Sequence, residues 1–556
     1  MLDKIRPWVA ANPRWTLTLL TSVLLAPFLA KPFNLDDPLF IWLAQQVHVH
    51  PGDPFGFAVN WYGWASPMWM ATENPPGAGY YFALAGSIFG WGEIGLHLGG
   101  LLAALAVILG THRLARRFCG QPMLATCAVL FTPVFLVSAN TIMCDVLMLA
   151  FWVWAVVFWM EGIEQDHSGK IIVAGVLIAL ALLTKYFGVA LIPLLAVHGA
   201  LAKRKMGPWI VGLLIPLAAL GAYQWLTLAL YHHGLFSKAA GYAASGQSGL
   251  GFSKLAGGLI TLAFTGGGAA TVLFLAPSLW RTRTLLAIFA GTALAGGTLC
   301  WGGNILKNYD GLEDSVARTA VVGQMIFWAI GGALALAVTA TDVWRSPRDS
   351  RSWLLVLWVA GTLFFTAFGN WTVNGRSLLP LLPALGILLA RRWEAGGQMR
   401  SKALQFGLAG SVLLALLVAQ SDFQLAIAVR RSAQEACAKC AQARGSVWFE
   451  GHWGFQYYMD KLGALPVDLN HPKPQAGDIL VIPAHNTDIY RPAPEIVARR
   501  EVLTIRNPSM LATWNAAVGA GFYASVVGPL PFGFGKVPAE TVFIYELRAA
   551  VPSGVK

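Results

Sequence analysis

Charged side chains are scarce in this chain of 556 residues, at 12% of the sequence, and Asp and Glu together number only 27. Hydrophobic residues make up 56%. A soluble globular protein of this length could not bury so much apolar surface, because the interior of a fold has limited room. The composition therefore excludes an ordinary soluble protein and indicates an integral membrane protein.

Two further features are lacking. The six cysteines do not form a disulfide framework. Cys437 and Cys440, in the stretch CAKC, leave a local disulfide open, but no further Cys or His pair has the spacing of a metal site. No basic tract is interleaved with aromatic residues, so the net charge of +12 predicts membrane orientation and no nucleic-acid partner.

What the chain does contain is a series of long apolar runs, such as 15–30, 101–110 and 171–183. A transmembrane helix needs roughly 20 mainly apolar residues. Runs and breaks together predict about thirteen spans over the first 420 residues. The segment 78–93 is short and glycine-rich, and we expect it to lie on the membrane or dip into it rather than cross.

With that assignment, most Lys and Arg up to residue 402 fall on the side of the amino terminus, which predicts a cytoplasmic amino terminus. An odd number of spans places the tail on the outer side. We therefore expect a membrane domain at 1–421, with a first outer loop at 31–93 that carries interface helices, and an outer α/β domain at 422–556. In this domain the patterns predict a helix at 455–463 and strands at 446–451, 478–484, 501–506, 522–527 and 540–547.

Five charged residues on the outer side are not explained by orientation: Asp36, Asp37, Asp145, Lys185 and Arg376. An ionisable group at membrane depth costs a few kcal/mol unless it faces a cavity or a partner. These groups come from distant parts of the sequence, so they predict one polar cavity at the outer leaflet. A carboxylate there suits deprotonation of an attacking hydroxyl or amine, and Lys and Arg suit a phosphate.

Simpler interpretations remain open for each residue. Asp36 and Asp37 are suited to capping an interface helix that starts at Pro38, and Asp145 to capping a span. Lys185 fits a turn in water, and Arg376 fits an interface position from which it reaches the headgroups. Four other lysines on the outer side are expected to be ordinary loop residues: Lys31, Lys238, Lys254 and Lys307.

The order of these motifs resembles a known family. An acidic pair in the first outer loop (LDDPLF), a proline pair (ENPPG), an Asp at the end of the second outer loop, LLTKYFG and GRSLLPLLP follow one another on the outer side. This arrangement is similar to that of GT-C fold glycosyltransferases that use polyprenyl-phosphate sugars, above all the protein O-mannosyltransferase and lipid A aminoarabinose transferase superfamily. The resemblance covers roughly residues 14–420 and implies a GT-C membrane domain with an outer carboxy-terminal domain.

The chain departs from the family pattern at four positions. Asp37 replaces the usual Glu, Asn74 stands where the lipid A enzymes have Lys, Gly77 replaces a bulky residue, and Ser377 stands where Tyr is common. The change at Asn74 alters one phosphate contact that the family pattern contains.

The resemblance implies a role for each site residue. Asp36 is the catalytic base, which deprotonates an acceptor as it attacks the anomeric carbon with inversion. Lys185 and Arg376 hold the leaving phosphate, with Asn74 as a further substrate contact, and Asp145 is a second catalytic residue that orients the acceptor or the loop of Asp36. Asp37 supports an interface helix or binds a divalent cation, the only cofactor considered.

The implied partners are a polyprenyl-phosphate-linked sugar donor, the lipid bilayer and an acceptor that is a glycolipid, a protein or a polymer. The expected location is a bacterial inner membrane with the carboxy-terminal domain in the periplasm. Two alternatives stay open: a transporter or flippase of a lipid-linked or small polar substrate, and an inert binding protein with the same scaffold. Transporters usually show internal repeats, and none is evident here.

Overall fold

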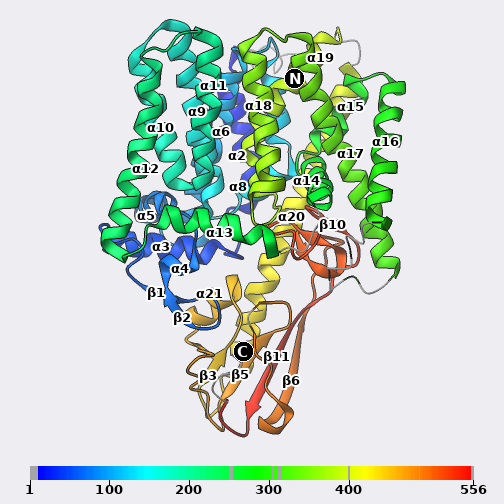
Figure 1. Ribbon diagram of the computed structural model, residues 1–556. Coiled ribbons are helices and arrows are strands. Elements are labelled where there is room, and N and C mark those ends of the chain that lie inside the picture. The colour runs from blue at the N-terminus through cyan, green and yellow to red at the C-terminus, as the bar shows by residue number, and fades with distance from the viewer. Residues whose placement is uncertain are drawn as a thin grey trace.

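The computed structural model describes residues 11–249, 254–302, 306, 309, 312, 315–397, 401–487 and 489–551, so Lys307 lies outside the described residues. The chain forms a bundle of membrane helices above a smaller part that contains a β-sheet (Figure 1). The fold class predicted from the sequence, a polytopic helical membrane protein with a small α/β region at its carboxy-terminal end, is confirmed.

Within the described residues, eight helices are long and apolar enough to cross a membrane, or up to ten if two bent pairs each count as one span. The count of about thirteen spans is therefore not confirmed; the other predicted spans fall on shorter helices, α2 (Pro13–Leu25), α10 (Ser168–Thr184) and α19 (Leu382–Ala395). The long helices are α6 (Glu93–Ala115), α9 (Cys144–Gln165), α11 (Leu191–Lys203) with the preceding η2 (Tyr186–Ala190), α12 (Trp209–Tyr231), α16 (Thr282–Gly302), α17 (Ser315–Arg345), α18 (Ser350–Phe364) with η4 (Phe365–Gly369), and α20 (Ser401–Cys440).

Two pairs of helices are bent at a short break. Helices α7 (Pro122–Leu130) and α8 (Pro133–Ala139) meet at 64°. Pro133 has no backbone N–H to donate, and its ring disfavours the helical conformation in the residue before it, so the helix breaks there. Helices α14 (Lys254–Gly268) and α15 (Thr271–Leu279) meet at 80°. Both bends fall near the middle of predicted spans, so a long apolar run does not guarantee a straight helix.

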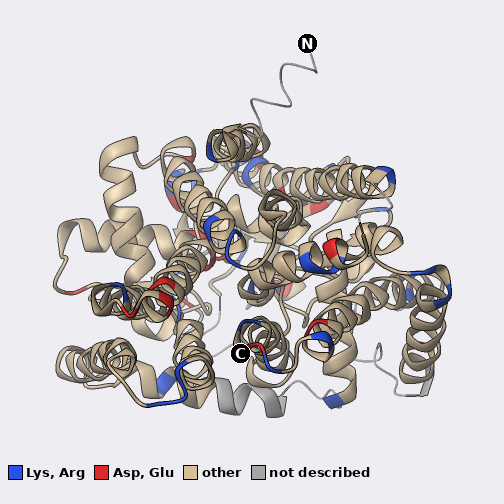
Figure 2. Ribbon diagram, turned by 90° about the horizontal axis from the view of Figure 1, so that it is seen from above, with Lys and Arg blue, Asp and Glu red and all other residues tan. Residues whose placement is uncertain are grey.

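One end of the bundle carries a network of ion pairs. Glu161 on α9 accepts from Arg113 at 2.7 Å and from Lys170 at 2.7 Å, and Glu164 pairs with Arg351 at 2.9 Å. Figure 2 shows basic and acidic residues at helix ends when the molecule is viewed from above. Three of the basic residues that the sequence assigned to one side of the membrane, Arg113, Lys170 and Arg351, thus lie at one end of the bundle.

The segment 31–93, predicted as the first outer loop, packs beneath the other end of the bundle (Figure 1). Its helix α5 has 13 residues, a length of about 20 Å, which is too short to cross the hydrocarbon core. Helix α2, on which a predicted span falls, has the same length, so the interpretation of 78–93 as a segment that does not cross stays a prediction. The elements of the loop are α3 (Asp37–Val49), the paired strands β1 (Ala58–Asn60) and β2 (Ala65–Pro67), α4 (Met68–Ala71) and α5 (Gly77–Phe89).

The carboxy-terminal part is built on a mixed five-stranded sheet of order β4-β3-β5-β11-β6. Strand β11 runs antiparallel to β5 and β6, and β3 runs parallel to β4 and β5. The elements are β3 (Val447–Phe449), α21 (Trp453–Lys461), β4 (Leu465–Pro466), β5 (Ile479–Pro483), η6 (Pro494–Ile496), β6 (Val497–Ile505) and β11 (Glu540–Leu547). Most of the predicted strands and the predicted helix are therefore present.

The predicted strand at 522–527 is wrong. Those residues follow β9 (Ala520–Gly521) in a long excursion between β6 and β11. Ser525 N–H donates to the Val373 carbonyl at 2.8 Å, and Gly375 N–H donates to the Phe522 carbonyl at 2.7 Å. A membrane-domain loop therefore satisfies the backbone groups that a sheet would otherwise pair. The excursion also holds β7 (Leu511–Ala512), β8 (Trp514–Asn515), η7 (Ala516–Val518), β9 (Ala520–Gly521) and β10 (Gly533–Phe534).

Helix α20 joins the two parts without a break, since its 40 residues run from the bundle toward the sheet (Figure 1). The boundary proposed at 421 falls inside this helix, so the division between 1–421 and 422–556 stays a proposal. Cys437 and Cys440 both lie on α20 with free thiols, and neither forms the disulfide that the sequence left open.

Candidate active site

Four of the predicted site residues come together at the end of the bundle that faces the carboxy-terminal part. Asp36 directly precedes α3, Asp145 lies in the first turn of α9, Lys185 joins α10 to η2, and Arg376 opens η5 (Arg376–Leu381). These elements lie far apart in the sequence. Their convergence brings two carboxylates and two cations into one cluster.

The four side chains form a continuous chain of opposite charges. Arg376 Nη2 lies 3.0 Å from Asp36 Oδ2, and Arg376 Nη1 lies 3.8 Å from Asp145 Oδ2. Lys185 Nζ donates to Asp145 Oδ1. Asp145 is fully buried, whereas the Asp36 side chain is 34% exposed. The most accessible carboxylate of the cluster is therefore that of Asp36.

A tight turn presents Lys185. Lys185 has an extended backbone after the last turn of α10, and a Cβ at Gly188 would lie 2.5 Å from the Leu182 backbone nitrogen. A side chain at 188 would thus push the turn away from α10. The glycine in LLTKYFG is explained by this close approach.

Gly77 holds the proline-pair motif beside the same turn. A Cβ at Gly77 would lie 2.6 Å from the Leu183 carbonyl oxygen, directly before Thr184 and Lys185. The bulky residue found here in the family would not fit this packing. Asn74, from the same motif, accepts from Cys144 Sγ at 3.6 Å and so lies beside the first turn of α9.

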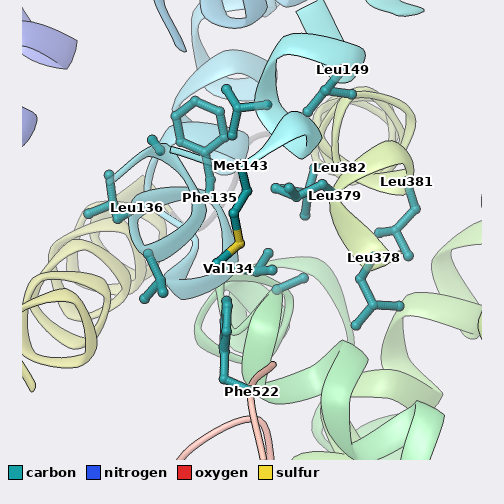
Figure 3. Packing of buried hydrophobic residues seen from close by; sticks show 14 of the residues in the cluster. Val134, Phe135, Leu136, Met143, Leu149, Leu378, Leu379, Leu381, Leu382 and Phe522 are labelled. Carbon is teal, nitrogen blue, oxygen red and sulfur yellow. The ribbon is translucent and has the colours of Figure 1, made fainter. Parts of the chain in front are cut away.

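Arg376 is held by groups on both sides. Its guanidinium carbon lies 5.5 Å from the centre of the Tyr523 ring, and its Nη1 lies 2.7 Å from Met143 Sδ. Ser377, which replaces the common Tyr, donates through its hydroxyl to Asn374 Oδ1 at 2.9 Å. Figure 3 shows Met143, Phe522 and the leucines that follow Ser377 in one buried cluster, which packs around η5.

Asp37 takes a different role from its neighbour. Its side chain is fully buried and accepts from Asn34 N–H at 3.0 Å and from Ile142 N–H at 2.7 Å. Burial raises the pKa of Asp37 to about 6, and Lys31 opposes that rise. Asp37 thus ties the first outer loop to the segment before α9.

The simpler capping interpretations do not describe these carboxylates. Asp36 stands at the N-cap of α3 but makes no side-chain capping hydrogen bond, and the N-cap position of α9 belongs to Met143 rather than Asp145. Arg376 and Lys185 are both in ion pairs, so neither is only a turn or headgroup residue.

Asp37 is fully buried and each of its carboxylate oxygens accepts a backbone N–H, so these hydrogen bonds account for its position without a divalent cation. Among the described residues no group of three or more His, Cys, Asp or Glu side chains could hold a metal ion.

The sequence did not predict a second buried network of charged residues, around Lys31. Lys31 is not an ordinary loop residue: its side chain is 2% exposed and its Nζ lies 2.5 Å from Asp422 Oδ2 on α20. Asp422 also accepts from Thr513 at 2.7 Å and from Tyr523 at 3.0 Å. Tyr523 therefore contacts both networks, since its ring faces Arg376.

Two other outer lysines differ in their surroundings. Lys238 lies on α13 (Leu235–Gly249), which runs across the lower edge of the bundle in Figure 1. It pairs with Glu73 at 2.9 Å, so it supports the proline-pair motif and is also not an ordinary loop residue. Lys254 is the exposed first residue of α14.

An apolar cavity of about 760 Å³ reaches Leu183 and Thr184, the two residues that precede Lys185. Its walls come from the start of α5, from α9, from the end of α10 and from α12, and they include Gly77, Phe151, Leu183, Thr184 and Leu226. A polar group held by Lys185 could therefore continue into an apolar chain within this cavity.

Comparisons with known proteins bear on this arrangement. Residues 73–225 match the family model of dolichyl-phosphate-mannose-protein mannosyltransferase. No curated protein sequence matches the chain. Among solved structures, ArnT from Cupriavidus metallidurans bound to undecaprenyl phosphate is similar with a TM-score of 0.50 and 14% identity, over 86% of this chain and 93% of ArnT.

The archaeal oligosaccharyltransferase AglB from Archaeoglobus fulgidus, in complex with an inhibitory peptide and a dolichol-phosphate, has a TM-score of 0.46 and 13% identity, over 83% of this chain and 64% of AglB. The resemblance predicted from the motifs is confirmed: the chain shares the GT-C glycosyltransferase fold with ArnT over most of its length and matches the mannosyltransferase family over 73–225.

Proposed function

We propose that the protein is a membrane glycosyltransferase that moves a sugar from a polyprenyl-phosphate donor to an acceptor on the periplasmic face of a bacterial inner membrane. The observation that carries this proposal is the chain of charges from Asp36 through Arg376 and Asp145 to Lys185. An apolar cavity whose wall includes Thr184, the residue before Lys185, supports it. ArnT, which shares the fold, is bound to undecaprenyl phosphate, and this supports a lipid-phosphate donor.

Asp36 acts as the base in this proposal. Its side chain is the most exposed carboxylate of the cluster, so an acceptor hydroxyl or amine can reach it. Asp36 takes the proton as the acceptor atom forms a bond to the anomeric carbon, and the bond from that carbon to the phosphate oxygen breaks with inversion. The electron pair leaves with the polyprenyl phosphate.

The leaving phosphate needs stabilisation of charge more than a proton. Arg376 can present a planar set of N–H donors and Lys185 a point charge. Asp145, buried between them, keeps both cations at the same place while the phosphate is absent. Asn74 lies beside the first turn of α9, which carries Asp145, and is a further candidate contact to the donor. The polyprenyl chain would lie in the apolar cavity beside Lys185.

Substitution of the base tests the proposal. Asp36→Asn keeps the size of the side chain and removes its basicity, so the rate of transfer of labelled sugar from undecaprenyl-phosphate donors should fall by about 10²–10⁴-fold. Asp166→Asn is the matched control, because Asp166 is 81% exposed and pairs with Lys203, outside the cluster. An Asp36→Asn variant that transfers sugar at the wild-type rate would rule out this mechanism.

A further inference from the structure

A second cavity, of about 220 Å³, lies where the first outer loop, α20 and the carboxy-terminal part meet. We name it the junction cavity. The residues that matter for its chemistry are Asn34, Leu35, Trp453, His485, Trp514 and Glu540.

The junction cavity begins next to the proposed base. Leu35 directly precedes Asp36, and Asn34 N–H donates to Asp37 Oδ2 at 3.0 Å. The opposite wall is held against this loop, since Phe33 N–H donates to the Tyr458 hydroxyl of α21 at 2.9 Å. A molecule in the cavity would therefore lie beside the segment that carries Asp36.

Two of its wall residues have unusual backbone conformations. Leu35 has φ of 49° and Trp453 has φ of 65°, a left-handed region that bulky residues rarely adopt. Strained residues of this kind gather at functional sites, where the surrounding structure maintains them. Here both belong to walls of the same cavity, one from each part of the chain.

The walls combine aromatic faces with a few polar groups. The rings of Trp453 and Trp514 meet edge to face, with centroids 5.6 Å apart. Glu540 Oε2 lies 4.0 Å from His485 Nδ1. Burial raises the pKa of Glu540 to about 7, so near neutral pH its carboxyl group can donate as well as accept a hydrogen bond.

This combination suits a sugar ring. The C–H face of a pyranose is apolar and packs on an indole ring, while its hydroxyl groups need donors and acceptors at the rim. A lipid chain would leave Glu540 and the amide of Asn34 without partners in an apolar contact, which is costly. The cavity has room for one ring rather than for a folded peptide segment.

We propose that the junction cavity binds a sugar ring of the acceptor, so that the acceptor is a carbohydrate and the carboxy-terminal part selects it. The role of this sugar as the acceptor rests on the proposed function, whereas the binding of a sugar in the cavity does not. Trp453 and Trp514 supply the stacking surface, and Glu540, His485 and Asn34 orient the ring next to Asp36.

Binding of simple saccharides to the full chain in detergent tests the proposal. The probes are the methyl glycosides of glucose, galactose, mannose and N-acetylglucosamine, observed by saturation-transfer NMR. At least one should bind saturably to the wild-type protein. Trp514→Leu and Glu540→Gln should each weaken that binding by about tenfold or more, and Trp514→Phe should retain part of it.

Glu546→Gln is the matched control, because Glu546 lies on the same strand β11 but is exposed and outside the cavity. Circular dichroism and the thermal unfolding midpoint establish that each variant is folded. Failure of all four glycosides to bind the wild type, or equal binding by wild type, Trp514→Leu and Glu540→Gln, would overturn the inference.

The Asp36→Asn variant separates this inference from the proposed function. It should bind the glycoside as the wild type does, because Asp36 is not a wall of the cavity. Saccharide binding that persists while sugar transfer is independent of Asp36 would contradict the proposed mechanism and leave the cavity assignment standing. Transfer that depends on Asp36, in a protein that binds no glycoside, would contradict the cavity assignment alone.

Discussion

Asp36 and Asp145 lie on either side of the Arg376 guanidinium, but their environments differ. Asp145 is fully buried and holds Lys185 as well as Arg376, whereas 34% of the Asp36 side chain is exposed. Loss of a buried carboxylate leaves cations without compensation in a poorly solvated place. Loss of Asp36 leaves Arg376 its contact with Asp145. The two carboxylates should therefore contribute unequally to stability.

This difference gives a prediction at the scale of single residues. Asp145→Asn should lower the free energy of unfolding by about 3 kcal/mol or more, the usual cost of breaking a buried pair. Asp36→Asn should cost no more than about 1 kcal/mol. The midpoint of thermal unfolding in detergent measures both, with Asp166→Asn as the exposed control. Equal losses for the two variants would contradict the assignment of Asp145 as the structural centre of the cluster.

The sequence predicted this cluster because a charge inside an apolar run is costly unless it faces a cavity or a partner of opposite charge. It missed the pair of Lys31 and Asp422 for a physical reason. A lysine just after a span normally extends to the headgroups, and Asp422 stands at the predicted start of an outer domain. The two are separated by 391 positions, and only the fold brings them together. The roles proposed for the site residues stay predictions, since geometry alone does not test them.

At the scale of elements, α21 lies against the segment that leads to Asp36. A Cβ at Gly454 would lie 2.4 Å from the Phe33 carbonyl oxygen, so only glycine permits this approach. The first turn of α21 also carries Trp453, a wall of the junction cavity. The position of α21 therefore sets the shape of the cavity and supports the loop of Asp36.

Gly454→Ala should push α21 away from this loop. We expect a loss of about 1–3 kcal/mol in the free energy of unfolding, typical of overpacking, and weaker glycoside binding. Gly221→Ala is the control, because a Cβ there meets nothing within 4 Å and alanine favours the helix. Thermal unfolding and saturation-transfer NMR measure the two effects. A Gly454→Ala variant that behaves like Gly221→Ala would show that this contact is dispensable.

The elements were predictable to different degrees. The helix at 455–463 and the strands around β5 and β11 carry their own periodicity, which burial in the sheet preserves. The run at 522–527 has the same alternation but pairs with the loop at 373–375 instead of a sheet. Local pattern indicates that a backbone is extended; it does not indicate which distant segment supplies its hydrogen bonds.

At the scale of the whole molecule, the excursion between β6 and β11 connects the sheet to the membrane bundle. Glu540 pairs directly with Ile505, so the sheet itself needs no more than a short turn between them. The intervening residues instead bring Tyr523 to Arg376, and they bring backbone groups to the loop that precedes η5. The excursion thus acts on the site rather than on the sheet.

Replacement of residues 507–538 by a four-residue Gly/Asn turn tests whether the excursion acts on the site rather than on the sheet. Strands β6 and β11 should still pair as a hairpin, so the strand signal in circular dichroism should persist. Arg376 would lose the Tyr523 ring, and its loop would lose the hydrogen bonds at Phe522 and Ser525. Sugar transfer from the undecaprenyl-phosphate donor should then fall at least about tenfold, as expected when a catalytic group is displaced by about 1 Å. A Gly/Ser replacement of the loop 470–473 is the control, because none of these contacts involves it. Full transfer activity after loss of the excursion would mean that the bundle positions Arg376 alone, and that the carboxy-terminal part has no share in forming the phosphate site.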